Sequence, residues 1–325
     1  MSERPMLEVA HLRKSFIIRP HLFAKQAPEV KAVDDVSFHV RTGETLGLVG
    51  ESGSGKSTTG RLILRLTAAT GGSVTFDGVE LLRLPKEKFQ AYRKDLQMIF
   101  QDPGASLNPV YRVSDTLEEP LRVHHPSLSK AERKERVADL LEQVGLDPAV
   151  AGRFPHTFSG GQKQRISIAR ALSVRPRFIV ADEPVSALDV SIQSQVLTLM
   201  EDLKGRYGLS YLFISHDLSV VRHMSQRVAI MYRGRVVETA SSTDIYKTPA
   251  HPYTQTLLNA IPRVRVNRSI RPPQGAVAPS APPVESSGRG CAFCPRCPFA
   301  TLDCGQTTPE LREIAPAHWA ACHIL

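Results

Sequence analysis

One segment of the chain has the residue pattern of a phosphate-binding loop. Residues 50–57 read Gly-Glu-Ser-Gly-Ser-Gly-Lys-Ser, which fits G-x4-G-K-[ST], and they directly follow the apolar run 45–49. Glycines let the backbone curl so that successive N–H groups point at phosphate oxygens, while the lysine neutralises charge and the serine ligates Mg²⁺. A plain turn is the alternative, but the strand-then-helix context favours a nucleotide site. Its predicted contacts are Gly50, Gly53, Gly55, Lys56, Ser57 and Thr58.

Two carboxylates follow a second apolar run. Residues 178–183 read Phe-Ile-Val-Ala-Asp-Glu, and ligands of open α/β sheets bind at the carboxyl ends of such strands. We expect Asp182 to hold Mg²⁺ through water and Glu183 to act as the general base that polarises an attacking water. Alone, this pair would more often be a helix-capping turn. Downstream of a phosphate loop, the catalytic interpretation is favoured.

A third segment has the composition of an anion site. Ser159, Gly160, Gly161 and Gln162 precede an expected helix over 166–172. A serine and two glycines at a helix N-terminus can bind an anion. By itself this pattern indicates only an ordinary helix start. One phosphate group needs only one cradle, so a second anion site requires a further explanation.

The segments that must position these residues alternate between strands and helices. Apolar runs at 45–49, 178–181 and 211–214 end at polar or glycine-rich turns, which is typical of a parallel sheet covered by helices on both faces. Between two of them, the segment 129–144 has apolar residues at three- and four-residue spacing, and this predicts one face of a helix. The pattern indicates an α/β fold with a helical insert.

The bulk composition excludes several classes of protein. The 325 residues are 42% hydrophobic and 22% charged, and no apolar run approaches the roughly 18 residues needed to cross a bilayer. The first residues lack the apolar core of an export signal, so we expect a cytosolic protein. The net charge is +9, but the basic residues are scattered without interleaved aromatics. We therefore expect no nucleic-acid partner.

The composition changes after residue 248. Residues 251–325 hold 11 of the 24 prolines, seven arginines and no lysine. Within them, residues 271–290 are rich in Pro, Ser, Ala and Gly, which predicts an extended linker. The cysteine segment 291–322 follows it. In a reducing cytosol, clustered cysteines hold a metal more often than they form disulfides, and both a redox sensor and a structural staple are open roles.

Three further motifs occur in order along the chain. Gln101 follows Met-Ile-Phe, Asp189 ends Ser-Ala-Leu-Asp, and His216 follows Tyr-Leu-Phe-Ile-Ser. With the phosphate loop and the Ser-Gly-Gly-Gln segment, they resemble the motif series of the ABC ATPases. The resemblance implies a P-loop ABC-type nucleotide-binding domain with a RecA-like core, an antiparallel β subdomain and a helical subdomain at about 102–175.

The resemblance also implies a role for each motif. Gln101 would contact Mg²⁺ and relay the nucleotide state to membrane subunits, and Asp189 would lie in the D-loop at a dimer interface. His216 would contact the γ-phosphate and Glu183. The Ser-Gly-Gly-Gln segment would close over ATP held by a partner subunit, so that two subunits enclose two ATP molecules. The predicted Mg²⁺ contacts are Ser57, Gln101 and Asp182.

Phe16 is the expected adenine-stacking aromatic residue. This position is often tyrosine in the ABC ATPases. The alternative is that Phe16 belongs to the core of the first strand.

The chain most resembles the F-type ATP-binding subunits of oligopeptide and dipeptide importers. The stretches that carry this resemblance are 43–58, 99–109, 182–197, 211–238 and 251–262. It implies an ABC ATP-binding domain at 6–250 and an oligopeptide/dipeptide-transporter-type C-terminal region at 251–325. It also implies an ATPase that powers peptide uptake from the cytoplasmic face of a bacterial membrane. Its partners would be a second, D-type ATPase, two permeases and, indirectly, an extracytoplasmic peptide-binding protein.

In the same family, some members bind a [4Fe–4S] cluster at C-terminal cysteines. The matching positions here are Cys291, Cys297, Cys304 and Cys322, with Cys294 as a possible substitute ligand. Thiolates suit tetrahedral zinc as well as iron–sulfur clusters, so zinc and plain thiols are alternatives.

Two other functions compete with peptide import. The same motor could serve nickel or another small cargo, because the ATPase does not touch the substrate. A soluble ABC ATPase acting on ribosomes or DNA is the second rival. It is disfavoured because this chain has one uninterrupted ATPase domain.

Overall fold

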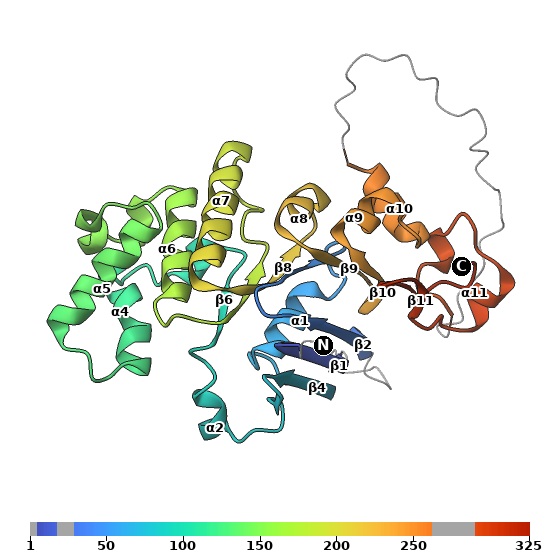
Figure 1. The fold of residues 1–325 in the computed structure, drawn as a ribbon, viewed down its shortest axis with the longest axis horizontal. Helices are drawn as coiled ribbons and strands as arrows, with labels where there is room; N and C mark the ends of the chain where they lie inside the picture. Colours follow the sequence, from blue (N-terminus) through green and yellow to red (C-terminus); the bar gives the residue numbers. More distant parts are fainter. Residues whose placement is uncertain (1–4, 18–28, 262–289) are drawn as a thin grey trace, which may run out of the picture.

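An eight-stranded sheet forms the centre of the computed structural model, which describes residues 5–17, 29–261 and 290–325. Its strand order is β11-β12-β10-β9-β3-β8-β7-β6, and the five strands from β9 to β6 are parallel (Figure 1). These five are β9 (Arg227–Tyr232), β3 (Thr45–Val49), β8 (Ser210–Ser215), β7 (Phe178–Asp182) and β6 (Leu96–Ile99). Strands β3, β7 and β8 are buried along their whole length, so the predicted covered parallel sheet is confirmed.

Successive residues of the central strands enter two different apolar clusters. In β8, the side chains of Tyr211 and Phe213 belong to the cluster that includes the helices between residues 113 and 224. Leu212 and Ile214 belong to the cluster that includes α1 (Lys56–Ile63) and the antiparallel strands. Because strand side chains alternate between the two faces, one short apolar run supplies both layers of the core.

A four-stranded antiparallel sheet packs on one side of the central sheet. Its order is β2-β1-β4-β5, formed by β1 (Leu7–Ile17), β2 (Glu29–Val40), β4 (Gly71–Phe76) and β5 (Val79–Glu80). A short helix, α2 (Lys86–Gln90), leads from it towards β6. The expected antiparallel β subdomain is thus present.

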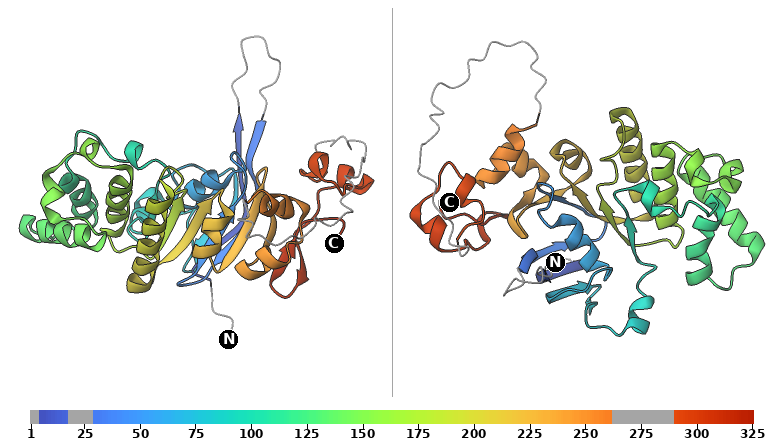
Figure 2. Two further views of the ribbon diagram at one scale, coloured as in Figure 1. Left: turned by 90° about the horizontal axis from the view of Figure 1, so that it is seen from above. Right: turned by 180° about the vertical axis from the view of Figure 1, so that it is seen from behind.

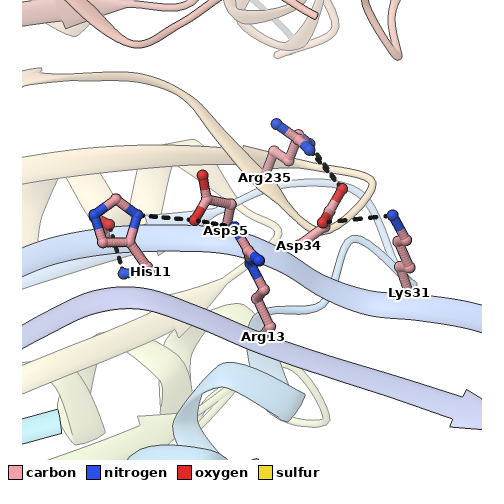
Figure 3. Close-up of polar contacts among 7 residues, drawn as sticks. His11, Arg13, Lys31, Asp34, Asp35 and Arg235 are labelled. Carbon is pink, nitrogen blue, oxygen red and sulfur yellow. Dashed lines mark hydrogen bonds and ion pairs between the residues drawn. The ribbon is translucent and has the colours of Figure 1, made fainter. Parts of the chain in front are cut away.

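An ion pair joins this antiparallel sheet to the central sheet, and another lies within the antiparallel sheet beside it. Figure 3 shows Arg235 reaching from β10 (Arg235–Ser241) to Asp34 of β2, with Nη2 2.7 Å from Oδ2. In the same view, His11 Nδ1 lies 2.9 Å from Asp35 Oδ1. Next to these pairs, the amide of Gly234 donates to the carbonyl of Ser54 at 2.8 Å. The turn between β9 and β10 therefore holds the phosphate loop beside β2.

Helices gather at one end of the molecule (Figures 1 and 2). The helix predicted over 129–144 is α5, which Ser129 and Glu132 start with reciprocal capping hydrogen bonds. The helix expected over 166–172 begins earlier, at Gly160, since Ser159 caps it. The elements are α3 (Pro103–Ser106), α4 (Val113–His124), α5 (Lys130–Gln143), the 3₁₀ turns Pro148–Gly152 and Pro155–Thr157, and α6 (Gly160–Leu172). Two further helices, α7 (Val190–Tyr207) and α8 (Leu218–Met224), follow β7 and β8.

The C-terminal residues lie at the opposite end and extend the central sheet. Strand β12 (His318–Ala320) pairs antiparallel with β10, and β11 (Arg312–Ala315) pairs with β12. The carboxylate of Glu238, which is fully buried in β10, accepts hydrogen bonds from the amides of Ala250 and His251 and contacts His318 Nε2 at 2.7 Å. The other elements are α9 (Ser242–Lys247), α10 (Pro252–Asn259), the 3₁₀ turn Cys294–Arg296 and α11 (Leu302–Gln306).

This C-terminal arrangement bears on the predicted organisation of the chain. Of the predicted linker 271–290, only Gly290 lies within the described residues. The division into 6–250 and 251–325 stays a prediction, although the two parts share one sheet. Among the described residues, no helix is both long and apolar enough to cross a membrane.

Candidate active site

The phosphate loop lies between β3 and α1, as its sequence pattern predicts. At Gly50 a Cβ atom would lie 2.1 Å from the carbonyl oxygen of Met231, so no larger residue fits. Gly55 has a φ of +103°, and a Cβ there would lie 2.2 Å from the carbonyl oxygen of Ala32. The loop is thus pressed against β9 on one side and β2 on the other. The first amides of α1 face the loop, as in an anion-binding site.

Lys56 is held inside this loop. Its side chain is buried, and its ammonium donates to the carbonyl oxygens of Gly50 at 2.7 Å and Glu51 at 2.9 Å. Burial lowers the pKa of this ammonium, while the nearby carboxylates of Glu183 and Asp182 oppose the shift. A third, longer contact joins the ammonium to the Ser54 hydroxyl at 3.5 Å. A cation held by neutral loop oxygens can exchange these hydrogen bonds for charge-assisted bonds to phosphate oxygens.

Ser57 and Asp182 form a pair that suits a magnesium ion. The Ser57 hydroxyl donates to Asp182 Oδ1 at 2.7 Å. Asp182 is 1% exposed, and its Oδ2 is buried without a hydrogen-bond partner among the described residues. Burial raises the pKa of this carboxyl, although the hydrogen bond from Ser57 lowers it. A buried carboxylate oxygen without a partner beside a hydroxyl fits the oxygen ligands that Mg²⁺ and its waters prefer.

Glu183 is the meeting point of three segments. Its Oε2 accepts from Gln101 Nε2 at 3.0 Å and lies 3.2 Å from His216 Nδ1. The backbone at Glu183 has a φ of +46°, and its amide donates to the carbonyl of Ile214 at 2.9 Å. Left-handed backbone costs a non-glycine residue roughly 1–2 kcal/mol, and such strain is common at functional sites. The structure therefore brings together three residues that the sequence predicts for one site.

The Ser-Gly-Gly-Gln segment begins α6. Ser159 caps this helix, since its hydroxyl accepts from the Gln162 amide and the Gln162 side chain accepts from the Ser159 amide. A Cβ at Gly161 would lie 2.5 Å from Ile192 Cγ2, and one at Gly160 would lie 3.4 Å from Leu188 Cδ2. The two glycines are thus where α6 and the start of α7 meet.

Asp189 lies at the start of α7. Its carbonyl accepts the Gln193 amide at 2.8 Å, while its side chain makes no capping hydrogen bond. The next residue, Val190, is 79% exposed. This turn therefore presents an apolar side chain and a carboxylate beside the start of α6.

Phe16 lies on β1, opposite Val30 of β2. Its side chain is 43% exposed, so it is not a core residue, and the ammonium of Lys14 lies 4.9 Å from its ring centroid. An accessible ring is compatible with stacking on a base. Its role at the adenine stays a prediction.

Two contacts to the phosphate loop were missed in the sequence. The buried hydroxyl of Tyr253 accepts a hydrogen bond from the Glu51 amide at 2.9 Å. The guanidinium of Arg296 forms two hydrogen bonds with the Glu51 carboxylate, at 2.8 and 2.9 Å. Tyr253 lies in the 251–262 segment, and Arg296 lies within the cysteine cluster. Nothing in their spacing links them to residue 51.

All five cysteines line one small cavity of about 10 Å³, together with His251 and Phe293. They are free thiols, and burial raises the pKa of Cys291, Cys294, Cys297 and Cys322. Thiols are the donors that zinc and iron–sulfur clusters use, but these raised pKa values favour the neutral thiol over the thiolate that binds a metal. Within the described ranges, however, no group of three or more His, Cys, Asp or Glu side chains is arranged to hold an ion.

Two family models match the chain. The first, described as ABC transporter, matches residues 33–186, and the second, described as oligopeptide/dipeptide transporter, C-terminal region, matches residues 237–304. Together with the phosphate loop, the Glu183 site and the α6 segment, they define the class of protein. The chain belongs to the ATP-binding proteins of ABC transporters and is a transport ATPase.

Full-length relatives narrow this assignment to importers. The oligopeptide transport ATP-binding protein AppF of Bacillus subtilis is 48% identical over 324 residues, covering 99% of this chain and 98% of that protein. The oligopeptide transport ATP-binding protein OppF of Escherichia coli is 47% identical, covering 98% of this chain and 95% of that protein. A dimeric ATP-binding cassette, MJ0796 with ADP and Pi, superposes with a TM-score of 0.65 at 28% identity, covering 73% of this chain and 99% of that one. The chain is the ATP-binding subunit of an ABC importer.

Proposed function

We propose that this chain hydrolyses ATP to drive the import of oligopeptides or dipeptides. The observation that carries the proposal is the convergence of Gln101, Glu183 and His216 beside the phosphate loop, in a chain whose C-terminal region matches that of oligopeptide transporters. The cargo follows from the relatives and from that region alone. Nickel or another small solute is the competing cargo, because no part of the site contacts the transported molecule.

At one nucleotide site, the chain's own residues have distinct tasks. Lys56 and the loop amides bind the phosphates, while Ser57, Gln101 and Asp182 would hold Mg²⁺. The ion, when bound, neutralises charge that develops on the phosphate oxygens. Glu183 accepts the proton of the attacking water as general base, and His216 orients that carboxylate and contacts the γ-phosphate. Phe16 would stack on the adenine.

The second anion site acts on a partner's nucleotide in this proposal. Ser159, Gly160, Gly161 and Gln162 would cover the γ-phosphate of ATP bound to another subunit, and Asp189 would contact that subunit across the interface. Val190 is exposed, and the side chain of Asp189 makes no capping hydrogen bond to α7. Both features support an interface at this edge. The cassette MJ0796, similar in fold, is dimeric with ADP and Pi.

The assembly would be asymmetric. We propose a heterodimer with a D-type ATPase on the cytoplasmic face of the bacterial membrane, beneath two permeases that an extracytoplasmic peptide-binding protein supplies. No nucleic acid takes part. Affinity purification of the tagged chain from membranes, followed by mass spectrometry, tests this. Recovery with two permeases and a second ATPase is expected, whereas recovery with ribosomes or DNA would overturn the proposal.

A transport assay tests the cargo. Cells that depend on an external oligopeptide for growth should lose its uptake when Lys56 is replaced by alanine, because phosphate binding is lost. The matched control is Lys134→Ala on an exposed position of α5, which should leave uptake intact. If the Lys56 variant abolishes nickel uptake but not peptide uptake, the peptide assignment is wrong.

We propose separately that the cysteine cavity binds a metal cofactor. It would be a [4Fe–4S] cluster on Cys291, Cys297, Cys304 and Cys322, with Cys294 as a substitute ligand, or a tetrahedral zinc ion. The convergence of the thiols on one cavity supports the site. Absorbance near 400 nm with iron and sulfide analysis after anaerobic purification distinguishes the two. Colourless protein that contains neither iron nor zinc contradicts both.

A further inference from the structure

The C-terminal part of the chain holds the second residue of the phosphate loop at two points. Tyr253 of α10 accepts the hydrogen bond of the Glu51 amide, and Arg296 binds the Glu51 carboxylate through two nitrogens. The two contacts span 202 and 245 residues of sequence. Residue 51 is therefore fixed by groups that belong to neither the loop nor the helix that follows it.

Arg296 is itself held by an aromatic cluster. Its guanidinium carbon lies 5.9 Å from the ring centroid of Tyr232 and 5.7 Å from that of Phe293. The rings of Tyr232, Tyr253 and Phe293 pack against one another with centroids 4.5 to 5.4 Å apart. An arginine that stacks on aromatic rings and forms two hydrogen bonds to one carboxylate is held in one orientation, and a lysine could not reproduce this arrangement.

The backbone carbonyl of Glu51 contacts Lys56, the lysine of the phosphate loop. The Glu51 carbonyl accepts from the Lys56 ammonium at 2.9 Å and from the Ser54 amide at 3.1 Å. A turn of the Glu51 peptide would therefore move both the lysine and the middle of the loop. Arg296 and Tyr253 therefore act on the phosphate site through a single residue, Glu51.

We propose that Arg296 is a positioning residue for the ATP site, which orients Lys56 through Glu51 and so gives the C-terminal region control over ATP affinity. The inference rests on the proposed ATPase function of the same loop. Arg296 lies between Cys294 and Cys297, and the 3₁₀ turn Cys294–Arg296 carries it. A rearrangement of the cysteine cavity would therefore displace the contact to Glu51.

The Arg296–Glu51 ion pair is too exposed to contribute much to the stability of the fold. The side chains of Arg296 and Glu51 are 47% and 41% exposed, and exposed pairs contribute little to stability. Replacing Arg296 should thus leave the melting temperature nearly unchanged. The expected effect is on nucleotide binding, where a coupling of this kind changes affinity about 5-fold or more.

The experiment compares Arg296→Gln with a matched pair elsewhere. Arg177 pairs with Asp77 at 48% and 41% exposure and lies over Phe76, so Arg177→Gln removes a similarly exposed ion pair at the amino end of β7, opposite to the strand end that carries Asp182. With the full chain in its complex, Arg296→Gln should raise the KM for ATP about 5-fold or more while kcat changes less than about 2-fold. Arg177→Gln should change neither.

Two further variants separate positioning from a general structural role. Combining Glu51→Gln with Arg296→Gln should add nothing to either single change, because both break one contact. Arg296→Lys should restore only part of the affinity, and Tyr253→Phe, which removes a single hydroxyl, should raise the KM in the same direction. If Arg296→Gln and Tyr253→Phe bind ATP as the wild type does, the positioning role is wrong. If the wild type itself binds no ATP, the proposed function fails instead.

Discussion

The hydroxyl of Ser57 donates a 2.7 Å hydrogen bond to Oδ1 of Asp182, across 125 residues of sequence. It joins the first turn of α1 to the carboxyl end of β7, which lie on neighbouring parts of the same sheet edge. The other oxygen of Asp182 is buried and has no hydrogen-bond partner among the described residues. Two of the three side chains proposed for Mg²⁺, those of Ser57 and Asp182, are thus already in contact in the folded chain.

Replacement of Asp182 by asparagine should raise the Mg²⁺ concentration needed for half-maximal ATP hydrolysis. Loss of a carboxylate that holds the metal through water typically costs roughly 10- to 100-fold in metal affinity. A Mg²⁺ titration of the ATPase rate measures this. Asp147→Asn is the control, since Asp147 only caps a 3₁₀ turn in the helical end and asparagine can cap equally well. An unchanged Mg²⁺ requirement in the Asp182 variant would remove this carboxylate from the metal site.

Glu183→Gln should abolish most hydrolysis and leave ATP binding intact. A general base contributes roughly 10²- to 10⁴-fold, and the amide keeps the shape but cannot accept the proton of water. The variant should also trap the ATP-bound dimer, which size-exclusion chromatography with ATP detects. Glu201→Gln is the control, since it alters an exposed pair between Glu201 of α7 and His223 of α8, whose Oε2 and Nε2 atoms are 3.5 Å apart. Near-normal turnover of the Glu183 variant in the assembled transporter refutes the assignment.

A comparison of two capping serines, Ser159 of α6 and Ser129 of α5, tests whether Ser159 only starts a helix or also binds an anion. Ser159→Ala and Ser129→Ala each remove a capping box and should each lower the free energy of unfolding by about 1 kcal/mol. Only Ser159→Ala should also lower the ATPase rate of the assembled complex, by roughly 10²-fold, because its hydroxyl is proposed to bind phosphate in the partner. Chemical denaturation and ATPase assays measure the two effects. Equal ATPase rates in the two variants would leave Ser159 as a helix cap alone.

Stability should fall with acidity because of one buried histidine. His251 is 1% exposed and caps α10 through Nδ1, and burial lowers its pKa to about 4. In the unfolded chain the imidazole takes up its proton near pH 6.5, whereas in the folded chain it does so only near pH 4. The unfolded state therefore binds more protons in this window, and folding loses about 3 kcal/mol as the pH falls from 7 to 4.

Replacement of His251 by asparagine tests this dependence. The asparagine oxygen can still cap the Tyr253 amide but does not titrate, so the slope of unfolding free energy against pH should become shallower between pH 6.5 and 4. Urea unfolding at several pH values measures the slope. His156→Asn, at an exposed position of the turn Pro155–Thr157, should leave it unchanged. An equally steep slope in the His251 variant would show that other groups cause the acid sensitivity.

Much of the active site was predictable because its chemistry is local. Glycines at 50, 53 and 55 before Lys56 indicate a phosphate loop, and the loop is found between a buried strand and a helix. The two carboxylates at the end of β7 were placed correctly at the sheet edge. Glu183, Gln101 and His216 meet because each follows a strand of one parallel sheet, and parallel strands end at a common edge.

Other features could not be read from the sequence. The resemblance separates the chain at residue 250, yet β12 pairs with β10 and extends the central sheet. The sequence left a core position open as the alternative for Phe16, and the structure leaves its ring 43% exposed. The packing of Gly161 against Ile192 depends on how α6 meets α7, which no local pattern encodes.

Short motifs in the sequence were enough to predict the class of this protein and the residues of its proposed ATP site. The backbone of the phosphate loop and the ends of the strands depend on residues that are close in sequence, so short motifs predict them. The contacts that hold Glu51 of that loop are visible only in the folded chain. Glu51 and Arg296 are 245 residues apart and meet because the C-terminal residues fold back onto the central sheet. Such contacts arise from sheet topology and aromatic packing, which bring together residues whose spacing carries no signal.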